Sequence, residues 1–179
     1  MKPLFLPLLL AASGAVALPA QAGGAHQHGV ARLDVAVEPA RVTFYLDTPL
    51  DNLLGFERAP RSDAERQQAA AAVARLQDAG KLFRIDGAAG CKLAKVTLSS
   101  AVLGLPTPAA AAPAAKDDHA DLDGRFEFTC TAGTRAGFVE VGLFEAFAPM
   151  KRIELQLVSP KGQMKATLVR PASRVALVR

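Results

Sequence analysis

The chain has 179 residues, of which 50% are hydrophobic and 21% are charged, so it can bury a core and is too apolar to be intrinsically disordered. Aromatic residues make up only 6% and tryptophan is absent, which argues against a stacking surface for single-stranded nucleic acid. The formal net charge of +4 is also too small to indicate a nucleic-acid partner. Two cysteines and three histidines exclude a large metal cluster held by the protein alone.

Residues 1–22 have the features of a secretory signal. Lys2 supplies a positive start, a long apolar stretch follows, and Ala20-Gln21-Ala22 is a small-x-small cleavage site. A transmembrane helix needs about 20 apolar residues with flanking anchors, and this stretch is interrupted by a proline and a glycine. We therefore expect cleavage after Ala22, export to an oxidising compartment, and no membrane span in the mature chain, residues 23–179.

The two cysteines, Cys91 and Cys130, are expected to form a disulfide in such a compartment. The loop that they would close has roughly 40 residues, which corresponds to about 3–4 kcal/mol in the chain-entropy model. The alternative is a redox-active or metal-binding thiolate pair. The lack of CxxC spacing and of a nearby histidine argues against that alternative.

Alternation of apolar and polar residues predicts several strands. Residues 33–37 and 42–46 alternate on both sides of a turn at Glu38-Pro39-Ala40, which is typical of an antiparallel hairpin. The second strand should stop at Thr48-Pro49, because proline cannot donate to the ladder. Further strands are expected over residues 82–85, 92–99, 126–130, 139–143, 153–158, 164–168 and 175–177.

One main helix is predicted over residues 62–78. Ser62 and Glu65 have capping-box spacing, and Gly80 would end the helix. The apolar stripe of this helix comprises Ala69, Ala72, Val73 and Leu76. Together the elements predict an α+β fold of mostly antiparallel strands, either a sandwich or a strongly bent sheet, with the helix covering one face.

Residues 105–123 interrupt this pattern with three prolines, seven alanines and a run of aspartates. We interpret them as a flexible low-complexity insertion within a single domain, residues 23–179. Because the insertion lies between Cys91 and Cys130, the disulfide is expected to hold its base.

The residues give little indication of catalysis. No GxSxG, HExxH, P-loop or GxGxxG motif occurs, and the acidic side chains fall mostly on outward strand positions or in the insertion. We therefore expect no enzymatic activity.

Metal binding is the stronger hypothesis. Two imidazoles, of His26 and His28, would project to the same side of an extended chain, and the third lies among carboxylates in the insertion. Imidazole and carboxylate ligands suit zinc, with copper and nickel as competitors. The candidate ligands are His26, His28, His119, Asp117, Asp118 and Asp121. The alternative is that these side chains are merely solvated.

The C-terminal part is basic, with seven Lys and Arg residues from Lys151 onward and Glu154 as its acidic residue. This asymmetry fits either docking to an anionic partner or charges on edge strands that discourage aggregation.

Five short motifs, in order along nearly the whole mature chain, resemble the ZrgA-like periplasmic proteins of Gram-negative bacteria. They are His26-x-His28-Gly29, Gly55-Phe56-Glu57-x-Ala59-Pro60, Lys81-Leu82-Phe83, the Cys91 and Cys130 pair around a variable insertion, and Leu143-Phe144-Glu145-Ala146-Phe147. The resemblance implies a periplasmic zinc-binding accessory protein that acts beside a zinc ABC importer and has no catalytic role.

This chain departs from the family pattern where that family carries most of its histidine. The long His/Asp repeat typical of the insertion is reduced to Asp117-Asp118-His119-Ala120-Asp121, and Arg58 and Thr129 stand where histidine is common. We therefore expect one zinc site at most. It would form if residues 23–29, which carry His26 and His28, fold back toward the insertion. The alternative function is an envelope interaction module without a physiological metal site.

Overall fold

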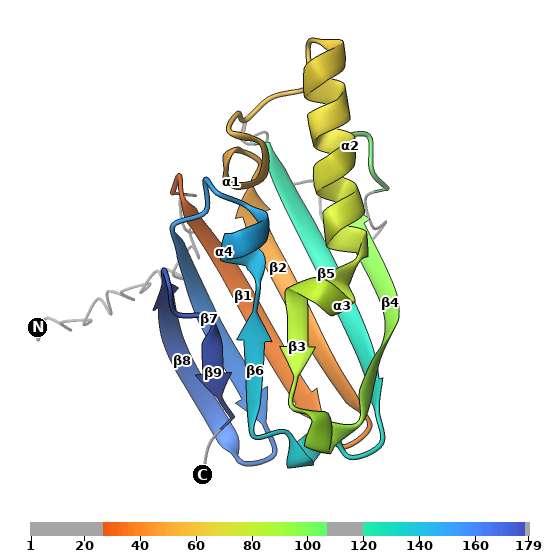
Figure 1. The fold of residues 1–179 in the computed structure, drawn as a ribbon, viewed down its shortest axis with the longest axis vertical. Helices are drawn as coiled ribbons and strands as arrows, with labels where there is room; N and C mark the ends of the chain where they lie inside the picture. The colour runs from red at the N-terminus through yellow and green to blue at the C-terminus, as the bar shows by residue number, and fades with distance from the viewer. Residues whose placement is uncertain (1–26, 107–119, 178–179) are drawn as a thin grey trace, which may run out of the picture.

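The computed structural model describes residues 27–106 and 120–177, and within these ranges the chain forms two β-sheets and four α-helices (Figure 1). The larger sheet has six strands in the order β4-β5-β2-β1-β7-β8, and the smaller has three in the order β3-β6-β9. In chain order the elements are β1 (Val30–Glu38), β2 (Arg41–Pro49), α1 (Asp51–Leu54), α2 (Asp63–Gln77), α3 (Ala79–Leu82), β3 (Phe83–Ile85), β4 (Cys91–Ser99), β5 (Asp121–Cys130), β6 (Phe138–Val141), α4 (Leu143–Ala146), β7 (Arg152–Ser159), β8 (Gly162–Val169) and β9 (Arg174–Ala176).

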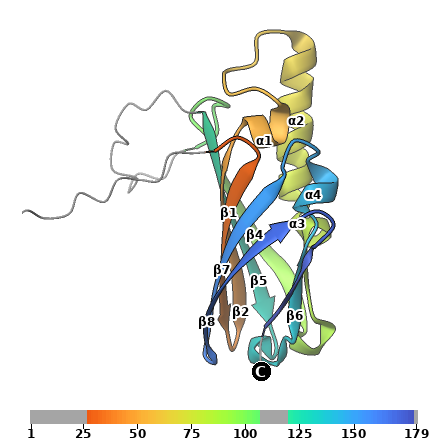
Figure 2. The same ribbon diagram turned by 90° about the vertical axis from the view of Figure 1, so that its left-hand side faces the viewer.

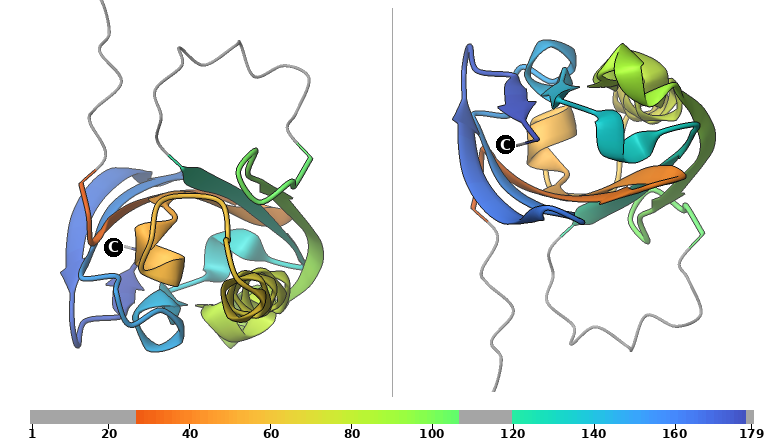
Figure 3. Two further views of the ribbon diagram at one scale, coloured as in Figure 1. Left: turned by 90° about the horizontal axis from the view of Figure 1, so that it is seen from above. Right: turned by 90° about the horizontal axis from the view of Figure 1, so that it is seen from below.

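The elements form two layers around a shared core (Figure 2). The six-stranded sheet is strongly bent, and its concave side faces the helices and the smaller sheet (Figure 3). Phe44 of β2 stacks on Phe83 of β3 with ring centroids 4.5 Å apart, so aromatic packing joins the two sheets. These observations confirm the predicted α+β fold of mostly antiparallel strands.

The first predicted hairpin is present. β1 and β2 pair antiparallel from Glu38 and Arg41 to Arg32 and Asp47, and β2 ends at Pro49. On its other side β1 pairs with β7 in parallel, which local alternation does not indicate. The pairing is parallel because the chain crosses to the second layer, through β6 and α4, before it returns to the large sheet.

The predicted helix is α2, and its cap is the one expected. Ser62 Oγ accepts a hydrogen bond from the backbone N–H of Glu65 at 3.2 Å. The predicted stripe is buried at Ala69, Ala72 and Leu76. The prediction that Gly80 ends the helix is wrong, because α2 ends at Gln77 and Gly80 lies inside the short helix α3.

The Cys91–Cys130 disulfide is confirmed. It joins directly opposed residues of β4 and β5, at one end of this strand pair. The expectation that it holds the base of the insertion is wrong. The ladder runs from Cys91 and Cys130 to Ser99 and Asp123, and the insertion leaves from this second end.

The insertion is also shorter than predicted. Its residues 107–119 lie outside the described residues, but β5 already begins at Asp121. Leu122 is fully buried between two more exposed neighbours, so residues 121–123 follow the alternation of a strand. The predicted signal, residues 1–22, also lies outside the described ranges. Across those ranges, every helix is too short or too polar to span a lipid bilayer.

Candidate metal centre

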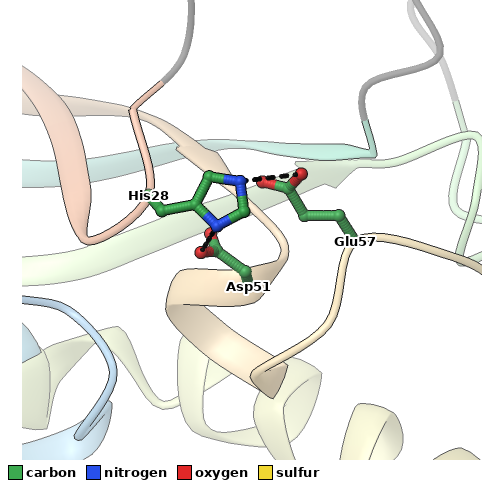
Figure 4. Close-up of side chains that lie close together, drawn as sticks. All are labelled: His28, Asp51 and Glu57. Atoms are coloured by element: carbon green, nitrogen blue, oxygen red, sulfur yellow. Dashed lines mark ion pairs between the residues drawn. The ribbon is translucent and has the colours of Figure 1, made fainter.

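Three side chains meet where the first strand begins and the second ends. His28 lies just before β1, and Asp51 is the first residue of α1, just after β2. The β1–β2 register, continued past the strand ends, places these two residues opposite each other. Glu57 comes from the loop between α1 and α2. The fold therefore brings one imidazole and two carboxylates together at one end of the large sheet (Figure 4).

Two glycines with positive φ give the backbone its course around this cluster. Gly29, at φ 81°, follows His28, and Gly55, at φ 79°, caps α1 and begins the loop that carries Glu57. Residues with a side chain rarely adopt this conformation. A Cβ at Gly29 would also lie 3.1 Å from Cδ of Lys151, so the bend before β1 is suited to glycine.

The imidazole of His28 lies between the two carboxylates. Its Nδ1 is 2.8 Å from Oδ2 of Asp51, and its Nε2 is 3.4 Å from Oε2 of Glu57. The His28 side chain is 74% exposed, whereas those of Asp51 and Glu57 are 15% and 23% exposed. The cluster opens to solvent in a hollow of about 340 Å³ lined by His28, Gly29, Asp51, Gly55, Phe56, Glu57, Pro149 and Lys151.

Asp51 is positioned by its neighbour Asn52, which is fully buried. The Asn52 amide donates to the carbonyl oxygen of Val30 at 2.8 Å and to Oγ1 of Thr48 at 3.0 Å. These bonds attach α1 to the start of β1 and the end of β2. The distance between Asp51 and His28 is therefore set by buried hydrogen bonds.

The loop of Glu57 is attached to the first turn of α2. Arg58 donates two hydrogen bonds of 2.8 Å each to the two carboxylate oxygens of Glu65. The backbone N–H of Arg61 donates to the same carboxylate at 2.7 Å. The hydrogen bond from Arg58, followed by that from Arg61, lowers the pKa of the Glu65 carboxyl to about 2.

This lowered pKa predicts a contribution of Glu65 to acid stability. The contribution should be complete above about pH 4.5 and lost as the pH falls toward 2, because protonation removes the charge that Arg58 and Arg61 stabilise. Denaturation midpoints at about pH 5 and about pH 2.5 measure it. Glu65→Gln should lose less stability over this interval than the wild type. An equal loss in both proteins would contradict the prediction.

The charge and ligand chemistry of the cluster fit a divalent cation. Among the described residues, no Lys or Arg pairs with the carboxylate of Asp51 or Glu57, so two negative charges face one imidazole. Oδ1 of Asp51 is buried and, within the described parts of the chain, has no hydrogen-bond partner. One imidazole nitrogen and two carboxylate oxygens form a ligand set that zinc accepts. These three ligand atoms lie within 4.8 Å of one another.

Both ring nitrogens of His28 contact a carboxylate oxygen. A zinc ion binds one nitrogen of a given imidazole, and that nitrogen must be deprotonated. Zinc binding at this ring would therefore take one of its nitrogens away from a carboxylate contact.

Two of the six predicted ligands lie in the described residues. His28 belongs to the cluster, whereas Asp121 lies opposite Pro49 at the start of β5 and is not part of it. The carbonyl of Ala120 accepts a hydrogen bond from the N–H of Leu50 at 2.8 Å, so the chain returns from the insertion beside α1. The other four predicted ligands lie outside the described residues and stay predictions: His26, Asp117, Asp118 and His119.

The sequence-based ligand set did not include Asp51 or Glu57. The observed hairpin register pairs Glu38 with Arg41 and so brings Asp51 opposite His28, whereas the predicted turn at Glu38-Pro39-Ala40 did not fix this register. Glu57 belongs to the Gly55-Phe56-Glu57-x-Ala59-Pro60 motif, but its loop has no periodicity from which a partner could be inferred.

Three basic residues of the C-terminal part have defined surroundings in the fold. Lys151 borders the hollow of the cluster, and Arg170 donates to three carbonyl oxygens in the loop after α4. Arg174 pairs with Glu140 of the smaller sheet at 2.8 Å. The docking of an anionic partner by the C-terminal part stays a prediction.

Comparison with known proteins identifies the family of the chain. A search of curated proteins finds no relative of this chain. The family model described as "ZrgA family zinc uptake protein" matches residues 25–177, which include the cluster, both sheets and the disulfide. The disulfide and this match are consistent with a location outside the cytoplasm. Because the match covers most of the sequence, the chain belongs to the ZrgA family of zinc uptake proteins.

Proposed function

We propose that the chain is a periplasmic, non-catalytic zinc-binding accessory protein, exported by cleavage after Ala22, that acts beside an ABC importer in zinc uptake. His28, Asp51 and Glu57 would hold the ion. The observation that carries this proposal is the cluster itself. Two carboxylates, which form no ion pair with a Lys or Arg of the described ranges, face an imidazole at the surface of a protein from a zinc uptake family.

The exposure of the cluster favours an ion that can be exchanged. A structural zinc site is closed by four protein ligands, whereas a site with three leaves a coordination position for water or another donor. The three side chains of the cluster would leave such a position, and it would face solvent through the hollow beside His28. An accessory protein that receives and gives up zinc needs this kind of access.

Isothermal titration of the untagged, exported protein tests the proposal. We expect saturable binding of zinc, removal of the ion by a chelator, and no comparable binding of magnesium, which prefers an octahedral shell of oxygen ligands. Titrations with copper and nickel measure the competition expected from the ligand set. A titration without zinc binding would overturn the proposed function.

Zinc affinity should depend on pH. It is expected to fall steeply below about pH 6.5, because imidazole protonates in that range and a protonated ring cannot bind the ion. Repeating the titration between about pH 7.5 and 5.5 measures the slope. Equal affinities across this range would show that no imidazole is a ligand.

A further inference from the structure

The loop that carries Glu57 is held by side-chain hydrogen bonds. Among the described residues, no backbone–backbone hydrogen bond involves residues 56–61, between the cap of α1 and the cap of α2. The loop is nevertheless placed so that the Glu57 carboxylate points at the His28 ring (Figure 4). Its conformation must therefore depend on side chains.

Those side chains are the immediate neighbours of Glu57. Arg58 is bound to Glu65 of α2 through two parallel hydrogen bonds of 2.8 Å, the strongest geometry available to an arginine–carboxylate pair. The same guanidinium lies 4.7 Å from the centroid of the Phe56 ring. The residues on both sides of Glu57 are thus held by one ion pair.

The pair also determines which charges surround Glu57. Arg58 follows Glu57 in the sequence, but its two hydrogen bonds to a carboxylate go to Glu65. A free Arg58 would be a cation next in sequence to Glu57 and could compete with a metal ion for its carboxylate. Glu65 therefore engages the Arg58 guanidinium as well as fixing the loop.

From this geometry we infer that Arg58 and Glu65 are positioning residues for cation binding, which couple the first turn of α2 to the cluster through Glu57. The inference rests on the proposed zinc site and adds two residues that touch no metal. Their contribution resembles that of outer-shell partners, whose loss typically lowers metal affinity about 10–100-fold.

A double-mutant cycle tests this inference. Zinc affinity is measured by competition with a chelator for wild type, Arg58→Met, Glu57→Gln and the double variant. Arg58→Met should weaken zinc binding about tenfold in the wild-type background and less than about twofold in the Glu57→Gln background, because the pair acts through Glu57. A weakening of the same size in both backgrounds, or no weakening in either, would overturn the inference.

Further variants separate positioning from loss of fold. Arg58→Lys keeps the charge and one hydrogen bond and should bind zinc with intermediate affinity, which loss of the fold would not produce. Glu65→Gln frees a cation beside Glu57 and should weaken binding at least as much as Arg58→Met.

The matched control is Asp63→Asn. It removes a carboxylate from the same helical turn, and the partner of that carboxylate is the exposed Arg66. It should stay within about twofold of the wild type. If Glu57→Gln and His28→Ala bind zinc as the wild type does, the proposed site fails and the inference with it. If they weaken binding and Arg58→Met does not, the inference alone fails.

Discussion

Replacement of His28 by alanine is expected to weaken zinc binding at least about 100-fold, or about 2.7 kcal/mol. This loss should exceed the 10–100-fold effect typical of outer-shell partners, because the variant removes a ligand. Asp51 and Glu57 would remain, but two carboxylates are a poorer ligand set for zinc than carboxylates with an imidazole. Chelator competition at neutral pH measures the effect.

The same experiment separates the observed cluster from the three-imidazole site that the sequence suggested. We expect His28→Ala to have the largest effect of the three histidine variants, because its ring contacts both carboxylates. His26→Ala and His119→Ala measure whether the other two imidazoles contribute. Wild-type affinity in His28→Ala would contradict the proposed site.

Removal of the Cys91–Cys130 disulfide is expected to lower the free energy of unfolding by about 3–4 kcal/mol in the chain-entropy model. The two cysteines are separated by 39 positions, so the bond constrains a long loop in the unfolded chain. Cys91→Ala/Cys130→Ala is the preferred variant, because Cys130 is buried and alanine leaves no unpaired polar group there. Denaturant unfolding measures the loss, and a reductant added to the wild type should reproduce it.

This variant should not change zinc affinity. The disulfide lies at the end of the β4–β5 pair that is opposite to the insertion, whereas Ala120 and Leu50 place the cluster at the insertion end. Unchanged unfolding midpoints would contradict the expected stability effect. A loss of zinc binding in the folded variant would contradict the separation of the two ends.

Local patterns predicted most elements of the fold correctly. The hairpin around Glu38-Pro39-Ala40, the cap at Ser62 and the strands of the C-terminal part follow from alternation, capping chemistry and turn residues, which are properties of neighbouring residues. The parallel pairing of β1 with β7 and the smaller sheet were not predicted, because they depend on contacts between distant segments.

The candidate site likewise combines residues that local patterns indicate with a residue that they do not. His28 was identified because histidine is scarce in this chain, and the observed hairpin register brings Asp51 opposite it. Glu57 reaches the cluster from the loop after Gly55, which Arg58 and Glu65 tie to α2. The contact of Glu57 with His28 joins residues far apart in the sequence. The motif that contains Glu57 therefore could not indicate a partner for its carboxylate.

The most direct test of the zinc site is a crystal structure of the protein soaked in zinc, with anomalous data collected at the zinc edge. The proposed function predicts an anomalous peak about 2.0–2.2 Å from one ring nitrogen of His28 and from carboxylate oxygens of Asp51 and Glu57. The opposite result is a zinc-soaked crystal in which the His28 ring still bridges the two carboxylates and no peak lies beside them. That result would show that the cluster is an ion pair and not a zinc site.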